Sequence, residues 1–168
     1  VFIPHAKGDA AHGAPWADAD MGQALAARMR HTPLQLLPVM RPEQVAWLSA
    51  QASLVVSSRY HPLVFGLAAA KPCLGIWSDD YTRIKLLGAL AHHGCAHAAC
   101  SVPDLHDGLL SRRLADLWHG RQGWHAHLWA QGQALAEDEA RRDEALATLF
   151  ATGQSPAIPV PARRAATF

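Results

Sequence analysis

Short apolar runs of strand type alternate with longer segments of helical spacing along most of the chain. Strands are expected over residues 1–5, 33–39, 54–56, 71–77 and 95–100. Helices are expected after Asp20 and Pro42, over 63–70, from Asp79 or Asp80 to Gly94, after Asp104, and over 124–150. This alternation predicts βαβ units, and therefore a Rossmann-like α/β fold with one parallel sheet and helices on both faces.

Residues 1–150 are expected to form this α/β domain. Residues 6–19 are rich in Gly, Asp and Pro and predict a loop that lines a site or acts as a hinge. Residues 151–168 are rich in Pro, Ala and Arg and predict a disordered tail. The chain opens inside a predicted strand, so we expect it to be the C-terminal part of a longer protein.

Composition excludes several classes of function. The 168 residues carry a formal net charge of +1, which gives no electrostatic footprint for nucleic acid. Half of the residues are apolar, but no run is long enough to span a membrane or has the layout of a signal peptide. Three cysteines without disulfide-framework spacing favour a reduced, cytoplasmic location.

The most informative segment is the hexad, residues 57–62, with the sequence Ser-Ser-Arg-Tyr-His-Pro. It joins a buried strand to a helix, and a helix N-terminus offers free N–H groups and a positive dipole end to an anion. Arg59 adds a planar fork that matches carboxylate or phosphate, and His61 adds a proton donor or acceptor near neutral pH. From spacing alone, ordinary capping by the two side chains is an equal alternative.

Other candidates lie where the remaining strands are expected to end. His5 follows the first strand and either touches the same edge of the sheet or is an ordinary surface histidine. Asp79 and Asp80 could bind sugar hydroxyls, but capping of the next helix is the stronger expectation. The His and Cys residues over 92–100 match no standard zinc spacing, so we expect no metal and no cofactor.

Together these residues resemble the polysaccharide pyruvyl transferase family. The resemblance covers roughly residues 1–95 and is strongest over 52–94. The family pattern reads Ser-Arg-Leu-His, a helix, Gly-x-Pro and an apolar strand, followed by a Tyr and a Lys in the next helix. This chain has Tyr60 where the pattern has Leu, and it supplies Tyr81 and Lys85 downstream.

The resemblance implies the C-terminal half of a GT-B architecture, whose N-terminal domain is missing here. It implies transfer of a pyruvyl group from phosphoenolpyruvate to a sugar of a surface polysaccharide or exopolysaccharide, as a ketal. Arg59, Tyr60 and Lys85 would bind substrate and His61 would be the catalytic residue. A glycan or lipid-linked sugar would be the acceptor, with the inner face of the membrane as a second possible location.

Two other classes of function stay open on the sequence. A GT-B nucleotide-sugar glycosyltransferase would place an acidic residue for the donor ribose near this edge, and no clean Glu is found there. A non-catalytic domain that binds anions or glycans would need Arg59 but not His61. The fold alone does not decide among the three.

Overall fold

The computed structural model describes residues 1–5 and 18–154. The chain divides into two compact units, residues 1–48 and 49–168. Most of the predicted loop over 6–19 and of the predicted tail over 151–168 lies outside the described residues. None of the described helices is both long enough and apolar enough to cross a bilayer.

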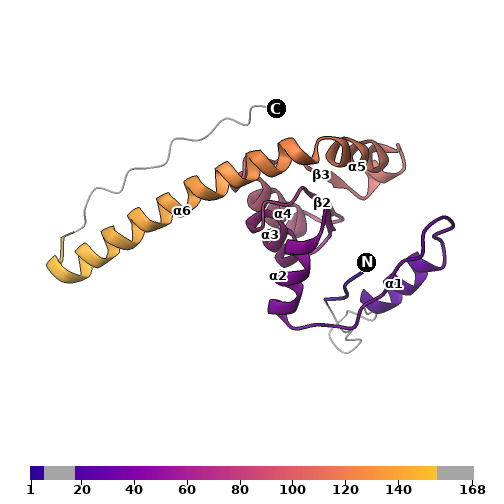
Figure 1. The fold of residues 1–168 in the computed structure, drawn as a ribbon, viewed down its shortest axis with the longest axis horizontal. Helices are drawn as coiled ribbons and strands as arrows, with labels where there is room; N and C mark the ends of the chain where they lie inside the picture. The colour runs from indigo at the N-terminus through magenta and orange to yellow at the C-terminus, as the bar shows by residue number, and fades with distance from the viewer. Residues whose placement is uncertain (6–17, 155–168) are drawn as a thin grey trace. The chain divides into compact units, whose positions relative to one another are not determined.

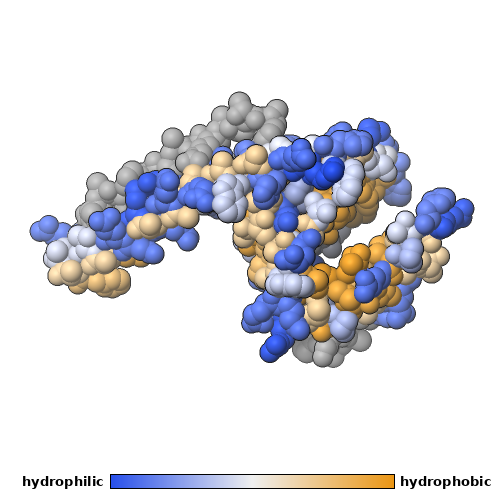
Figure 2. Space-filling model, viewed as in Figure 1, coloured by the Kyte–Doolittle hydropathy of each residue, from blue (hydrophilic) through white to orange (hydrophobic). Residues whose placement is uncertain are grey.

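The first unit is built around α1 (Asp18–Ala26) and one point of parallel pairing between Phe2 and Leu36. The Phe2 N–H donates to the Gln35 carbonyl at 2.8 Å. The helix packs closely on this pair, because a Cβ added to Gly22 would lie 2.7 Å from the Phe2 ring. Figure 2 shows hydrophobic surface on this unit, whose exposed large apolar side chains are Val1, Met21, Leu25, Met29, Leu36, Val39 and Trp47.

The prediction of strands over residues 1–5 and 33–39 is therefore wrong in extent. These segments pair with each other at a single bridge and do not join the sheet of the second unit, which has three strands instead of five. Prolines explain part of the difference: Pro4, Pro33 and Pro38 carry no N–H to donate to a ladder.

The second unit contains a parallel sheet in the order β1 (Val55–Ser57), β2 (Cys73–Trp77) and β3 (Ala99–Ser101). Two crossover helices, α3 (Tyr60–Ala68) and α4 (Asp80–His92), connect successive strands. The βαβ pattern is thus confirmed, with β1 one residue later than expected and β3 formed only by the end of the predicted 95–100 segment and the residue after it. The helix α2 (Pro42–Gln51) precedes β1, as predicted.

Helices cover both faces of this sheet. On one face, a Cβ on Gly66 of α3 would lie 2.7 Å from Cys73 Sγ, and one on Gly75 would lie 3.4 Å from Leu86 of α4. Leu74 points to the opposite face, because side chains alternate along a strand. There it lines a cavity of about 200 Å³ together with residues of the two C-terminal helices. The arrangement is that of a small Rossmann-like α/β unit.

The core of the unit lies between the sheet, α3 and α4. Its fully buried side chains include Leu63, Leu67, Leu86 and Leu90. The turn after α3 is tight: Ala70 adopts the left-handed conformation at φ +55°, and the Lys71 N–H donates to the Gly66 carbonyl at 2.9 Å. This six-to-one bond is the helix-ending pattern that favours Gly, so a non-glycine residue holds a strained position there.

The C-terminal part is helical. The 3₁₀ helix η2 (Pro103–Leu105) follows β3 and leads to α5 (Leu109–His119) and the 32-residue α6 (Arg121–Thr152). Figure 1 shows α6 extending well past α3 and α4, and Figure 2 shows mostly hydrophilic residues along its outer half. Only its first part joins the core, where Leu128 is buried.

Candidate functional site

The hexad lies at the C-terminal ends of the parallel strands, which we call the carboxyl edge of the sheet, where β1 ends and α3 begins. Ser57 is the last residue of β1, and its side chain closes a small turn with Arg59. The Arg59 N–H donates to Ser57 Oγ at 2.9 Å, and the same hydroxyl donates to the Arg59 carbonyl at 2.9 Å. The backbone of Arg59 is thereby fixed in an extended conformation directly ahead of the helix.

Arg59 is the N-cap residue of α3, and no side chain caps this helix end. Arg59 and His61 are both exposed, and Pro62 is buried as the third residue of the helix. The helix thus starts three residues earlier than the sequence predicted. Its N-terminus, with Arg59 beside it, has the features that favour an anion.

Aromatic rings surround the His61 imidazole on its own helix. The Tyr60 ring stands edge-on to it at 5.6 Å between centroids, and the Phe65 ring lies 6.3 Å away. Tyr60 itself is 40% exposed. These contacts restrict the orientation of His61 while leaving the ring open to solvent.

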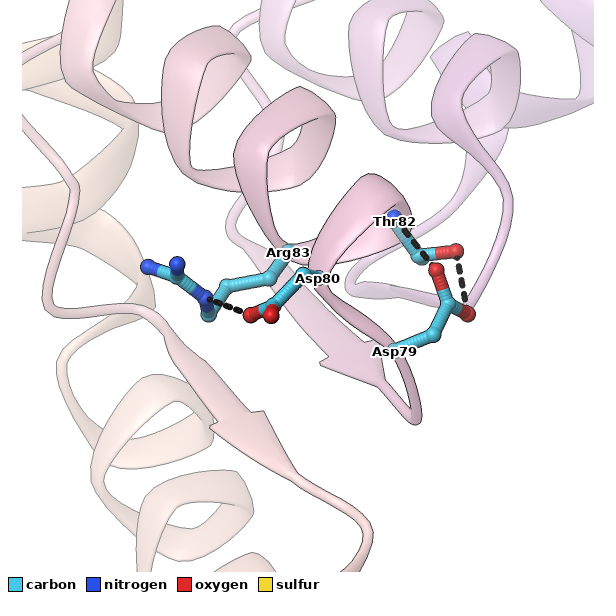
Figure 3. Close-up of polar contacts among 4 residues, drawn as sticks. All are labelled: Asp79, Asp80, Thr82 and Arg83. Atoms are coloured by element: carbon cyan, nitrogen blue, oxygen red, sulfur yellow. Dashed lines mark hydrogen bonds and ion pairs between the residues drawn. The ribbon is translucent and has the colours of Figure 1, made fainter.

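After β2, Asp79 caps the N-terminus of α4, as the sequence predicted. Asp79 accepts from the Thr82 N–H at 2.8 Å and from the Thr82 hydroxyl at 2.9 Å (Figure 3). The backbone bond to Thr82 is the main reason that the pKa of Asp79 is lowered. Asp80 pairs with Arg83 at 3.0 Å (Figure 3). Both carboxylates are therefore committed to the start of α4.

Lys85 lies one turn into α4, and its partner is Tyr81. The ammonium donates to the Tyr81 hydroxyl and lies 4.2 Å from the centre of the ring. Both residues are exposed. The Tyr and Lys of the family pattern thus form a local i, i+4 pair on a helix that starts at the same edge of the sheet as the hexad.

A similar reciprocal pair, not predicted from the sequence, lies at the end of the third strand, β3. The Ser101 N–H donates to an Asp104 carboxylate oxygen at 2.7 Å, and the Asp104 N–H donates to Ser101 Oγ at 3.3 Å. Hydrogen bonding of the Asp104 carboxylate by the side chain and the backbone N–H of Ser101 lowers the pKa of Asp104. The signal was present as Ser-x-x-Asp, the spacing of a reciprocal capping pair.

Three further histidines lie together away from this edge. His127 of α6 donates from Nε2 to the His93 carbonyl at 2.9 Å. Burial, followed by the nearby charges of other groups, lowers the pKa of both His93 and His97. Across the described residues, no three His, Cys, Asp or Glu side chains are arranged to hold a metal ion.

His5 lies in the first unit, where its N–H donates to Asp18 at 2.9 Å. The structure therefore gives it a local backbone role, and its expected place at the edge of the sheet stays a prediction. The residues that the second unit does bring to one edge are the hexad, Asp79 to Lys85, and Ser101 to Asp104.

The comparisons with known proteins bear on this edge directly. Searches of curated protein sequences and of solved structures return no significant match to this chain. A model of a family of transferases matches residues 22–80, which contain α2, β1, the whole hexad, α3 and β2. Tyr81 and Lys85 lie just beyond the matched segment. Over residues 22–80, the resemblance read from the sequence is confirmed: this part of the chain matches the polysaccharide pyruvyl transferase family.

Proposed function

We propose that this chain takes part in the transfer of a pyruvyl group from phosphoenolpyruvate to a sugar of a surface polysaccharide. The observation that carries the proposal is the family match over residues 22–80, which places the hexad inside the matched segment. The acceptor is a glycan or a lipid-linked sugar, and the reaction takes place in the cytoplasm.

In this proposal, Arg59 and the start of α3 hold the anionic donor. Phosphoenolpyruvate carries a carboxylate and a phosphate, and the planar guanidinium of Arg59 matches either group with two parallel hydrogen bonds. The α3 N-terminus has no side-chain cap, so the N–H groups of Tyr60 and His61, ahead of Pro62, are available to the second anionic group. Tyr60, the first residue of α3, contributes its backbone N–H.

His61 is proposed as the catalytic acid or base. The ketal forms when two sugar hydroxyls add to C2 of the donor, the C2–O bond to phosphate breaks, and the methylene carbon becomes a methyl group. Of the two hydroxyl protons, one balances the proton gained at the methylene carbon and the other leaves with phosphate. His61 serves one of these transfers, which contributes roughly a hundred- to ten-thousand-fold in rate.

Lys85 has a weaker place in the proposal. It lies outside the matched segment, and its ammonium is engaged by Tyr81. We assign it to the substrate as an additional cation near the edge of the sheet, with Tyr81 fixing its position.

The proposal also includes a second domain in a GT-B arrangement, which completes the site. Its consequence is that residues 1–168 alone bind donor weakly and show no turnover. Measurable pyruvyl transfer by this chain alone would contradict that part.

Competition between donors tests the function itself. The protein is titrated with phosphoenolpyruvate and with nucleotide sugars, and binding is followed through the amide signals of residues 57–61. We expect saturable shifts with phosphoenolpyruvate that nucleotide sugars do not displace. Shifts from nucleotide sugars alone would favour a glycosyltransferase. Donor binding by the complete wild-type protein without any turnover would favour a non-catalytic domain.

A further inference from the structure

A second cavity, of about 310 Å³, lies at the N-terminal ends of the strands, on the opposite edge of the sheet from the hexad. It is formed by the segment ahead of β1, by the turn between α3 and β2, and by the first residues of α6. The polar side chains that line it are those of Gln51, Ser53, Lys71, Arg121, Gln122 and His125. Ser53 and Lys71 precede β1 and β2, whereas the hexad lies where β1 ends. The two sites are therefore separated by the length of the strands, which is five residues in β2 at a rise of roughly 3.3 Å per residue.

The charges around this cavity are all of one sign. Lys71 and Arg121 are cations, and no Asp or Glu lines the cavity. Among the described residues, neither cation forms an ion pair with a carboxylate. Two cations that line one cavity without a counter-charge repel each other, and a bound anion offsets that repulsion.

The fold fixes the backbone of Lys71 and the guanidinium of Arg121. The backbone of Lys71 is fixed between the left-handed Ala70 and the buried Pro72. Arg121 donates from Nη1 to the Trp118 carbonyl at 2.8 Å and lies over the Trp118 ring, 4.7 Å from its centre. Its other guanidinium N–H groups stay available to a ligand.

His125 adds a third group with a defined orientation. Its Nδ1 lies 2.9 Å from the Ala70 carbonyl, and a carbonyl only accepts, so Nδ1 carries the proton. The Nε2 side of the ring is then an acceptor when His125 is neutral and a second donor when it is protonated.

We propose that this cavity binds a phosphate-bearing small molecule through Lys71, Arg121 and His125. Phosphate carries more charge than a carboxylate and offers more acceptor oxygens, which suits two cations, a histidine and two amide side chains around one space. The volume is at the lower end of the usual range for small-molecule sites, roughly 300–1,000 Å³. The site is separate from the hexad and does not rest on the proposed function.

The test is a titration of the isotope-labelled chain with inorganic phosphate, pyrophosphate and acetate at matched ionic strength. We expect saturable shifts at the amides of Ser53, Lys71 and Gln122, tighter for pyrophosphate than for phosphate and absent with acetate. Lys71→Gln and Arg121→Gln should each weaken pyrophosphate binding about tenfold or more, since each removes a charge-assisted contact.

Arg112→Gln is the matched control, because Arg112 is an exposed cation of α5 that lines neither cavity. It should leave pyrophosphate binding within about twofold, and the amide spectrum of each variant reports whether the fold is kept. Shifts that never saturate, or an equal loss in Arg112→Gln, would overturn the inference.

Two further outcomes would show that phosphate binds at the hexad instead, or that the chain recognises the phosphate of a lipid headgroup. If pyrophosphate shifts only the amides of residues 57–61, the inference fails while the proposed function stands. Co-sedimentation with vesicles of phosphatidylcholine and phosphatidylglycerol, without any shift from pyrophosphate, would instead indicate a membrane contact and also overturn it.

Discussion

Ser57 and Arg59 are joined by two hydrogen bonds through a single hydroxyl, each 2.9 Å long. These two bonds fix the backbone of Arg59 ahead of α3. They are made by Ser57 and not by the adjacent Ser58. Ser57→Ala should lower the local opening free energy by about 1 kcal/mol, the usual net value of one hydrogen bond. Hydrogen exchange at the Arg59 amide should then be several-fold faster.

Ser58→Ala is the control for this change, because Ser58 is exposed and has no hydrogen bond in the structure. It should leave exchange at the Arg59 amide unchanged. Equal acceleration in both variants would show that the Ser57 hydroxyl does not hold the turn.

Two glycines offer a matched test of the packing. A Cβ on Gly66 would lie 2.7 Å from Cys73 Sγ and 2.9 Å from Val55, whereas one on Gly88 meets nothing within 4 Å. Gly66→Ala should destabilise the protein by about 1 kcal/mol or more, because overpacking costs about 1–3 kcal/mol and the better helix propensity recovers at most about 1.

Gly88→Ala should raise the free energy of unfolding by up to about 1 kcal/mol, because Ala is the better helix former at an open position. Urea unfolding followed by circular dichroism measures both variants. If Gly66→Ala were as stable as Gly88→Ala, the close packing of α3 on β1 and β2 would be wrong.

The histidines at the end of α4 predict a pH dependence of stability. Burial, with the charges of His92 and His127, lowers the pKa of His93, and burial with Arg113 and His127 lowers that of His97. Because the unfolded chain binds these protons more readily, stability is full above the ordinary value of about 6.5 and falls as the pH drops below it. Urea midpoints across this range should fall with pH, and His93→Gln with His97→Gln should flatten the slope.

The three cysteines should be inert while the protein is folded. Cys73, Cys95 and Cys100 are fully buried, and burial raises the pKa of the Cys95 thiol to about 12. Only the thiolate reacts readily, so a disulfide reagent at mildly alkaline pH should label no cysteine until denaturant is added. Fast labelling of Cys95 in the native protein would contradict the burial of this loop.

The βαβ part of the fold was predictable because its signals agree with one another. Val55 and Leu74 of the strands and Leu63, Leu67, Leu86 and Leu90 of α3 and α4 are buried, and turn residues separate the elements. The segments at 1–5 and 33–39 carry the same apolar character, but the pattern alone does not reveal whether a short run finds a strand to pair with. The prolines in these segments were the signal against a full strand, and the structure leaves side chains such as Val39 exposed.

The candidate site was predictable in its outline and not in its details. The strand-to-helix position of the hexad follows from the sequence, and the capping role of Asp79 was expected. Which of Ser57 and Ser58 would bind Arg59 depends on the turn geometry, which no pattern of residue types reveals. The cavity at the opposite edge was also invisible, because Lys71 and Arg121 are fifty residues apart in the sequence.

The kinetics of Arg59 and His61 variants test the central claim most directly, in the complete enzyme with phosphoenolpyruvate and a verified glycan acceptor. Arg59→Ala should raise KM for phosphoenolpyruvate by roughly tenfold or more, because a charge-assisted hydrogen bond is worth about 1.5–3 kcal/mol, and Arg59→Lys should recover little of it. His61→Ala should lower kcat by roughly a hundredfold or more with little change in KM. Wild-type kcat in His61→Ala would contradict the account, and the hexad would then be a structural turn between β1 and α3.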